Sequence, residues 1–577
     1  MLGLALGAAN PKLRLEGQIQ AVAILAPPCA PPSAGDLARG PFLPRESQRV
    51  SQAIHPASSG ELFGHPKGLY VCFLTEMWER FAFYGMKALL FLYLTKHHLF
   101  TDSNGYLLLG TYAGLAYALP LLGGILADRY LGMRKAVVFG GVLLVLGQLG
   151  MAFTGSQASG SVGAAQQDLL ALQVMYGSLA LIAVGVGFLK PNISTIVGRL
   201  YAEADPRRES GFTIFYMGIN VGAWISSLVV AWVGEVIGWG YGFALAGVMM
   251  ALGLVQFMLG QKHLRGLAEP SNPEHLAAPA FAGLSREWLI YLASLVGTVA
   301  VWQVLQTRLD FSWLGAVFEG HVVTLTEVVA VVLATGLLVW FCRFLFSGVT
   351  PLERGRMITL MVLIAISALF WGLYELSYGP WIAFAERTSD LRALGFEWQA
   401  SQTTNFGAAF VILFSPIFAW LWPRLDKRNL NPGLAVKFGL ALILVGLAMG
   451  LLQIGAESGD RGQLVSLWWI IGAYAVMVLG EMLLSPIGLS AVTTLSVPRV
   501  VGMMMGAWFL ASAFGEMIAG RFGTWASIAP EADGSFDGPK ALTTYGEFFG
   551  QMMWIGIAAG VFMLLLSPLL NRLTRPR

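Results

Sequence analysis

Cysteine and charge are both scarce in this chain, and each shortage excludes a class of protein. The 577 residues include three scattered cysteines, Cys29, Cys72 and Cys342, without the spacing of a disulfide framework or a metal site. We interpret Cys72 and Cys342 as small buried residues. Only 12% of the residues are charged and 56% are hydrophobic, whereas soluble domains carry roughly 25% charged residues. The chain is therefore predicted to be a polytopic membrane protein.

Further missing features exclude other functions. The net charge of +3 is too small to indicate a nucleic-acid partner. No strand-like alternation repeats along the chain, which excludes a β-barrel. No predicted span contains His-Glu-x-x-His, Gly-x-Ser-x-Gly or paired aspartates, so we expect neither an enzyme nor a metal site or organic cofactor. A receptor or structural role fits poorly because the chain has no sizeable soluble domain.

The first 65 residues differ from the rest. Prolines interrupt any helix there, and the apolar run at 21–26 is too short to span a bilayer. Lys12 and Arg14 follow the short apolar start instead of preceding it, which disfavours a signal peptide. We expect residues 1–65 to be a disordered cytoplasmic extension or an overlong start, with a regulatory segment as the alternative.

Fourteen apolar stretches follow, and each is long enough to cross a bilayer. The predicted spans are 69–95, 105–127, 135–154, 169–191, 212–235, 241–261, 286–306, 322–346, 357–379, 400–422, 433–453, 464–491, 501–524 and 548–570. Loops after even-numbered spans are richer in Lys and Arg than loops after odd-numbered spans, so the positive-inside rule predicts that both termini are cytoplasmic. These basic residues include Arg129, Arg134, Lys135, Arg199, Arg207, Arg208, Lys262, Arg265, Arg343, Arg354, Lys427, Arg428 and Arg572.

Two spans differ from the other twelve. Residues 286–346 carry few polar groups and are flanked by long linkers, so we interpret residues 266–350 as an inserted helical hairpin. The predicted fold is all-α, with one six-helix bundle at 66–265 and a second at 351–577. Two similar halves around a site near the bilayer midplane are the usual plan of transporters.

The first span is the most informative one because it is charged. Glu76, Glu79, Arg80, Tyr84 and Lys87 lie three or four residues apart and form one stripe of the helix. Each ionisable group at bilayer depth costs at least about 2.5–3.5 kcal/mol, so such groups usually face a water-filled cavity. The stripe therefore predicts a charged pathway.

Three further motifs lie in the first half. Residues 123–132, with Asp128 and Arg129, resemble the cytoplasmic gate loop of the major facilitator superfamily, whereas a topogenic loop is the alternative. Pro191 follows Lys190 at the end of span four, where we expect the helix to bend; simple snorkelling of Lys190 is the alternative. Asn220 in span five either joins two helices through a hydrogen bond or belongs to a recognisable sequence motif with the neighbouring aromatic and glycine residues.

Taken together, these motifs resemble the proton-dependent oligopeptide transporter (POT) family, bacterial branch, from about residue 69 to the end. The motifs that carry the resemblance are Glu76-x-x-Glu79-Arg80-Phe81-x-Phe83-Tyr84, 188–193, 215–220, 370–375, 480–490 and 503–510. The resemblance implies the major facilitator fold and uptake of di- and tripeptides coupled to inward proton flow, with protons as the coupling ion. It also implies a carrier in the cytoplasmic membrane that functions as a monomer.

The resemblance assigns residues to the two ends of a peptide. Arg80, Lys190 and Tyr84 would bind the carboxylate, whereas Glu481, with Asn220 and Asn405, would bind the ammonium. The remaining peptide-binding positions by resemblance are Ser485 and the side-chain pocket of Tyr117, Trp371 and Trp508.

Proton coupling needs carboxylates that exchange partners in the cavity. The coupling residues by resemblance are Glu76, Glu79, Arg80, Lys87, Lys190 and Glu375. We expect Glu375 to pair with Lys87 across the two halves, and Lys190 to reach Glu76 or Glu79. The hypothesis is a shifting set of ion pairs; static pairs that hold helices together are the alternative.

Four positions depart from the family pattern. Phe83 replaces a tyrosine, Lys87 stands where an arginine is common, and Leu376 follows Glu375 where the family typically has a glutamine. Gly110 fills a position that is histidine in animal relatives, so histidine-based proton sensing is not expected. The alternative function is a facilitator for another solute, such as nitrate or a peptide-like drug.

Overall fold

The structure is a computed structural model, and it describes residues 61–202, 205–281, 283–310, 322–459, 464–531 and 535–574. The extension predicted at 1–65 lies outside these residues except for its last part. There the short antiparallel strands β1 (Glu61–Leu62) and β2 (His65–Pro66) lead into the first helix.

Thirteen helices of the described chain are long and apolar enough to cross a membrane. Helix α1 (Lys67–Leu92) has the length but not the composition, because it buries Glu76, Glu79, Arg80 and Lys87. Its 26 residues extend roughly 39 Å, which exceeds the hydrocarbon core of about 30 Å. With α1, the helices account for all fourteen predicted spans of this multi-pass membrane protein.

The elements up to the hairpin follow the predicted order. They are η2 (Tyr93–His97), α2 (Asp102–Ala118), α3 (Pro120–Leu126), η3 (Ala127–Leu131), α4 (Met133–Met151), α5 (Leu169–Arg199), α6 (Arg208–Trp232), η4 (Val233–Ile237), α7 (Trp239–Gly260), η5 (Gln261–Leu264), α8 (Pro273–Ala277), β3 (Pro279–Phe281), β4 (Leu284–Ser285), α9 (Arg286–Gln306), β5 (Arg308–Asp310), β6 (Val322–Thr324) and α10 (Leu325–Leu345). Side-chain oxygens of Thr101 and Asp168 accept backbone N–H groups at the starts of α2 and α5. Helix α5 continues through Pro191 to Arg199, beyond its predicted end.

The second half repeats the plan. Its elements are α11 (Pro351–Tyr374), η8 (Glu375–Tyr378), α12 (Pro380–Thr388), β7 (Ser389–Asp390), β8 (Arg392–Ala393), β9 (Phe396–Glu397), η9 (Ser401–Thr404), α13 (Asn405–Lys427), α14 (Leu434–Ser458), β10 (Val465–Ser466), α15 (Leu467–Leu495), η10 (Pro498–Val500), α16 (Val501–Gly523), η11 (Thr524–Ala526) and α17 (Gly538–Thr574). The ninth span breaks at Gly379-Pro380, because proline removes a backbone donor and favours a helix start.

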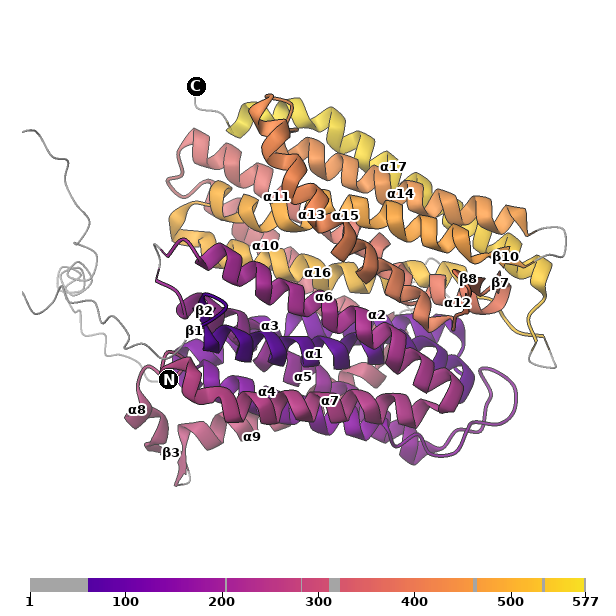
Figure 1. The fold of residues 1–577 in the computed structure, drawn as a ribbon, viewed down its shortest axis with the longest axis horizontal. Helices are drawn as coiled ribbons and strands as arrows, with labels where there is room; N and C mark the ends of the chain where they lie inside the picture. The colour runs from indigo at the N-terminus through magenta and orange to yellow at the C-terminus, as the bar shows by residue number, and fades with distance from the viewer. Residues whose placement is uncertain are drawn as a thin grey trace, which may run out of the picture. The chain divides into compact units, whose positions relative to one another are not determined.

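The helices pack into two groups, each with its own apolar core. In the first group α1 packs against α6 and α7, and α4 packs against α5 and α7. In the second group α14 packs against α15 and α17, and α11 packs against α16. Figure 1 shows the first group in indigo and magenta below the second group in orange and yellow. The two groups meet where α2 contacts α16 and where α6 contacts α13.

The α9–α10 hairpin contacts both groups. Gln173 Nε2 on α5 donates to Gln306 Oε1 on α9 over 2.9 Å, and Arg521 on α16 pairs with Glu327 on α10 at 2.7 Å. The predicted domain limits at residues 265 and 350 stay a prediction. The expectation that Cys342 is buried is wrong, since Cys342 is exposed on α10, where Val331, Val332 and Leu338 are exposed as well.

The two ends of the helices form two faces of the molecule. We call the end that carries the loops after odd-numbered spans, with η2, α12, β7 and β10, the odd-loop face; it lies at the right of Figure 1. The opposite end, with the loops after even-numbered spans and the strands β1 and β2, is the even-loop face.

Candidate functional site

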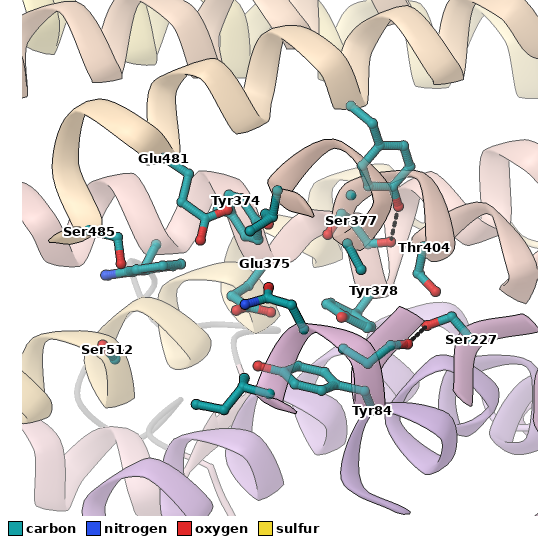
Figure 2. A pocket seen from close by; sticks show the side chains of 18 of the residues that line it. Tyr84, Ser227, Tyr374, Glu375, Ser377, Tyr378, Thr404, Glu481, Ser485 and Ser512 are labelled. Atoms are coloured by element: carbon teal, nitrogen blue, oxygen red, sulfur yellow. Dashed lines mark hydrogen bonds between the residues drawn. The ribbon is translucent and has the colours of Figure 1, made fainter. Parts of the chain in front are cut away.

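A cavity of about 190 Å³ lies between the two helix groups. It has room for several water molecules, each of which occupies about 30 Å³ in the liquid. Side chains of both groups form its wall (Figure 2). The main lining residues are Tyr84, Tyr117, Tyr216, Asn220 and Ser227 from the first group, and Trp371, Tyr374, Glu375, Tyr378, Thr404, Glu481, Ser485, Ser512 and Glu516 from the second.

Glu481 on α15 places a carboxylate in the wall that the second group contributes. The residue is 7% exposed, and its Oε2 has no hydrogen-bond partner among the described residues. Tyr374 lies beside it, and the carboxylate points into the cavity in Figure 2. A buried carboxylate oxygen without a partner is unfavourable unless a ligand or water supplies a donor.

Arg80 on α1 lies behind the wall that the first group contributes. Its Nε is 3.2 Å from Oε1 of Glu76 and also pairs with Glu79. Its guanidinium carbon lies 5.2 Å from the ring centre of Phe83 and 5.8 Å from that of Tyr84. Nη2 of Arg80 is buried without a hydrogen-bond partner among the described residues. Arg80 therefore keeps one donor free on the far side of the cavity tyrosine Tyr84.

Lys190 on α5 takes a similar place behind Tyr117. Its Nζ lies 3.9 Å from the centre of that ring, which is a cation–π contact. We expected Lys190 to reach Glu76 or Glu79; in the described part of the chain it forms no ion pair with either. Both cations therefore lie on the first-group side, and each contacts a tyrosine that lines the cavity.

Lys87 on α1 joins the two groups. Its Nζ is 2.7 Å from Oε2 of Glu375 on η8, as the sequence predicted, and 2.6 Å from Oε1 of Glu516 on α16. The ring of Tyr378 lies 4.6 Å from the same nitrogen. Lys87 is thus bound by two carboxylates of the second group.

The structure places the predicted residues in three sets. Seven predicted positions line the cavity: Tyr84, Tyr117, Asn220, Trp371, Glu375, Glu481 and Ser485. Glu76, Glu79, Arg80, Lys87 and Lys190 lie behind this wall, close to one another on α1 and α5.

The third set contains two predicted peptide-binding residues that do not line the cavity and the two predicted gate residues. Asn405 donates its Nδ2 to the carbonyl of Trp224 over 2.8 Å, so it joins α13 to α6 instead. Trp508 is 6% exposed and packs against Gly488, where an added Cβ would lie only 1.9 Å from its ring. Asp128 and Arg129 are exposed at the even-loop face, and neither forms an ion pair with a described residue.

Sequence reasoning did not identify several residues of the site. Tyr216 and Tyr374 line the cavity and lie within the motifs 215–220 and 370–375, but the sequence alone assigned them no role. Tyr378 and Ser512 also line the cavity and carry neither a charge nor a motif. Glu516 had a signal, because a single acid inside the predicted span 501–524 is costly at that depth.

Polar contacts between the two groups gather at the odd-loop face. Asp102 at the start of α2 binds Arg387 of α12 through two hydrogen bonds of 2.6 and 2.7 Å. Lys96 pairs with Glu386 of α12, and Glu235 of η4 accepts the backbone N–H of Ser401 over 2.9 Å. The cavity is therefore closed toward this face.

Comparisons with known proteins agree with this arrangement. Residues 134–536 match the sequence profile described as the POT family. The chain is 31% identical over 525 residues to the dipeptide and tripeptide permease A of Cronobacter turicensis, covering 90% of this chain and 96% of the permease. It is 32% identical to the peptide transporter YePEPT of Yersinia enterocolitica, over 80% of this chain and 88% of that protein. A crystal structure of a peptide transporter POT in complex with sulfate superposes with a TM-score of 0.72 at 31% identity, covering 90% of this chain and 97% of that one.

Proposed function

The chain belongs to the POT family, and we propose on this premise that it is a proton-coupled symporter. It imports di- and tripeptides across the cytoplasmic membrane by alternating access. Relatives of this chain are named as peptide transporters or as dipeptide and tripeptide permeases, and the cavity between two helix groups supports the same function for this chain.

The observation that carries the proposal is the buried, unpartnered Oε2 of Glu481 in the cavity wall. A peptide is a zwitterion, and its ammonium group supplies the donor that this oxygen lacks. The carboxylate of the peptide points to the opposite wall, where Arg80 and Lys190 lie behind Tyr84 and Tyr117. Charge-assisted hydrogen bonds at both ends fix the peptide backbone.

Aromatic side chains give the cavity tolerance for different peptides. Tyr117, Tyr216, Trp371 and Tyr374 present broad apolar faces between the two charged ends. Such faces favour burial of any apolar side chain but do not specify one. We expect the protein to accept many dipeptides.

Protons drive the cycle through the buried ion pairs. Protonation of Glu375 weakens its bond to Lys87 and so loosens the contact between α1 and η8. Protonation of Glu76 or Glu79 frees Arg80 for the peptide carboxylate. No cofactor other than the proton takes part, and the cavity within one chain supports a functional monomer.

The distribution of basic residues sets the orientation. The even-loop face carries most of the loop Lys and Arg, so both termini are cytoplasmic. On this orientation the odd-loop face is external, and the pairs of Asp102 with Arg387 and of Lys96 with Glu386 support a state closed to the outside.

The test is uptake of dialanine into proteoliposomes under an imposed inward proton gradient. We expect accumulation above equilibrium that a protonophore abolishes. Exchange of dialanine without gradient-driven accumulation would contradict the coupling. Uptake of nitrate with no uptake of dialanine would instead favour the alternative carrier.

A further inference from the structure

Lys87 is bound by two acids that come from different elements of the second group. The Lys87 side chain is fully buried, whereas those of Glu375 and Glu516 are 9% and 3% exposed. Both carboxylates lie within hydrogen-bond distance of the same ammonium nitrogen, at 2.7 and 2.6 Å. Glu516 is therefore an equal partner of Lys87.

The charges of this cluster do not balance without a proton. One ammonium and two carboxylates sum to −1, and an uncompensated charge in a buried site is strongly unfavourable. The charged or titratable groups that face Glu516 are Lys87 on α1, Tyr112 and Tyr117 on α2, Lys190 on α5, and Glu375 and Tyr378 on η8. Lys190 is the other cation of this set, and in the described residues it contacts Tyr117 without pairing with Glu516. The cluster is neutral when one of its two acids holds a proton.

Glu516 also lines two neighbouring cavities. A small second cavity is lined by Tyr106 and Gly110 of α2, by Gly379 and Pro380 at the start of α12, and by α16. Among the described residues, Glu375 and Glu516 are the two that line both this cavity and the central one. Both acids are therefore within reach of water in the central cavity of about 190 Å³.

Close packing of α2 on α16 fixes the place of Glu516. A Cβ at Gly110 would lie 2.7 Å from the carbonyl oxygen of Glu516 and 2.8 Å from Cα of Gly520. Glycine is thus required at position 110 for this approach, which holds the backbone of Glu516 beside the first group. Its side chain then reaches Lys87 of α1.

We propose that Glu516 is a second proton-binding residue of the transport cycle, which shares one proton with Glu375 across Lys87 in the closed state. A further proton, passed from water in the central cavity that both acids line, forms an O–H bond on the acid that is still ionised. Lys87 then has no anionic partner on the second group, and the contact between α1 and α16 weakens. This inference rests on the proposed function, because it assigns one more residue to the same proton coupling.

The experiment compares wild type, Glu516→Gln and the control Glu547→Gln in proteoliposomes. Glu547 is an exposed acid on α17. Each protein is assayed for dialanine exchange without a gradient and for accumulation under an inward gradient of about one pH unit, which can drive about tenfold accumulation per coupled proton. The readout is the ratio of accumulation to exchange. A merely structural role of Glu516 lowers both rates together and leaves this ratio unchanged.

We expect the ratio to fall in E516Q by about the factor that one coupled proton provides, and to stay at the wild-type value in E547Q. A wild-type ratio in E516Q would overturn the inference. Absence of accumulation in wild-type protein would refute the proposed coupling itself, so the two failures are distinguishable.

A second measurement covers the case in which E516Q does not fold. Wild-type protein is treated with a hydrophobic carbodiimide, which reacts with protonated buried carboxylic acids, and the modified residues are located by mass spectrometry. We expect modification of both Glu516 and Glu375, decreasing as the pH rises. Modification of Glu375 with none of Glu516 at any pH would overturn the proposal.

Discussion

At the residue scale, Glu481 offers an acceptor oxygen that no described residue satisfies. Its Oε2 is buried in the cavity wall without a partner in the described chain. Substitution by Gln removes the charge but keeps the shape. Since a hydrogen bond to a charged group contributes about 1.5–3 kcal/mol, we expect E481Q to bind dialanine roughly 10- to 100-fold more weakly.

Competition against labelled dialanine measures this effect. N-acetyl-dialanine, which lacks the ammonium group, should compete equally with wild type and E481Q, and E547Q should match wild type for both ligands. Equal losses for dialanine and its acetylated form would show that Glu481 does not bind the amino end.

Asp168 contributes stability that depends on pH. It lies outside the spans at the start of α5, where its carboxylate accepts the backbone N–H of Ala171 and both the backbone N–H and the hydroxyl of Ser156. These hydrogen bonds hold the pKa of Asp168 below its usual value, and the bond from the backbone N–H of Ala171 has the largest effect. A lowered pKa stabilises the fold above the unfolded pKa of about 3.9, and this contribution is lost as the pH falls through the folded value.

We therefore expect Asp168→Ala to lower the melting temperature in detergent at neutral pH, and the deficit to shrink below about pH 3.5. Asp168→Asn keeps the capping oxygen without the charge, so its melting temperature relative to Asp168→Ala should not vary with pH. A deficit of the same size at both pH values would contradict this account.

The charged stripe of α1 was predictable from sequence because spacing alone places its members on one helix face. The pair of Lys87 with Glu375 followed from the resemblance. The second acid, Glu516, did not follow, since its partner is 429 positions away in sequence. The sequence assigned Lys190 to the carboxylate of the peptide, but its Nζ lies over the ring of Tyr117. The charge of a lysine predicts attraction to an anion and does not predict which aromatic ring the side chain contacts.

At the element scale, the contact between α2 and α12 closes the odd-loop face. The side chains of Asp102 and Arg387 are 4% and 6% exposed, and Asp102 also accepts the backbone N–H of Ile528 over 3.0 Å. Removal of one partner from a buried pair costs about 3–5 kcal/mol. Asp102→Asn should therefore favour opening of this face. Lys96→Gln breaks the more exposed pair with Glu386, which is worth about 0–1 kcal/mol.

Labelling of Ser512→Cys in the cavity measures the opening, in a background without the native cysteines. A membrane-impermeant maleimide applied at the odd-loop face should label D102N much faster than either the parent or K96Q. Equal labelling of D102N and K96Q would show that the buried pair does not control this face.

Hydropathy alone predicted thirteen of the fourteen spans, the exception being the charged helix α1. Backbone polar groups in lipid must be satisfied within the segment, so a long apolar run that crosses a membrane forms a helix. Hydropathy did not predict where helices end in water. Helix α17 begins at Gly538, before its predicted start at 548, and α5 extends to Arg199. Polar residues beyond the bilayer continue a helix when capping and tertiary contacts allow it, and hydropathy does not detect them.

At the scale of the whole molecule, the two helix groups must separate at the odd-loop face for a peptide to enter. Lys96 on η2 and Glu386 on α12 are in direct contact across the groups and are 44% and 25% exposed, so reagents reach them from outside. We expect Lys96→Cys/Glu386→Cys, treated with a short thiol cross-linker, to lose dialanine uptake and to regain it after reduction.

Each single cysteine variant treated with the same reagent is the control and should keep its uptake. Continued uptake by the fully cross-linked double variant would show that this face does not open during transport.

The packing of the two groups was predictable in outline, because the resemblance implies two bundles and the sequence divides at the apolar hairpin. The contacts of the hairpin with both groups were not. They depend on single polar pairs, Gln173 with Gln306 and Arg521 with Glu327, whose partners lie far apart in sequence.

The position of Arg80 between Glu76 and Glu79 has one more consequence. An incoming carboxylate does not meet a vacant cation; it must substitute for anions that the protein already supplies. Binding of the carboxylate end thus exchanges one anionic partner of Arg80 for another, so the charge alone contributes little net binding free energy. Such a site binds a peptide tightly only when the amino terminus of the peptide is bound as well. The peptide dissociates readily once that second contact is broken.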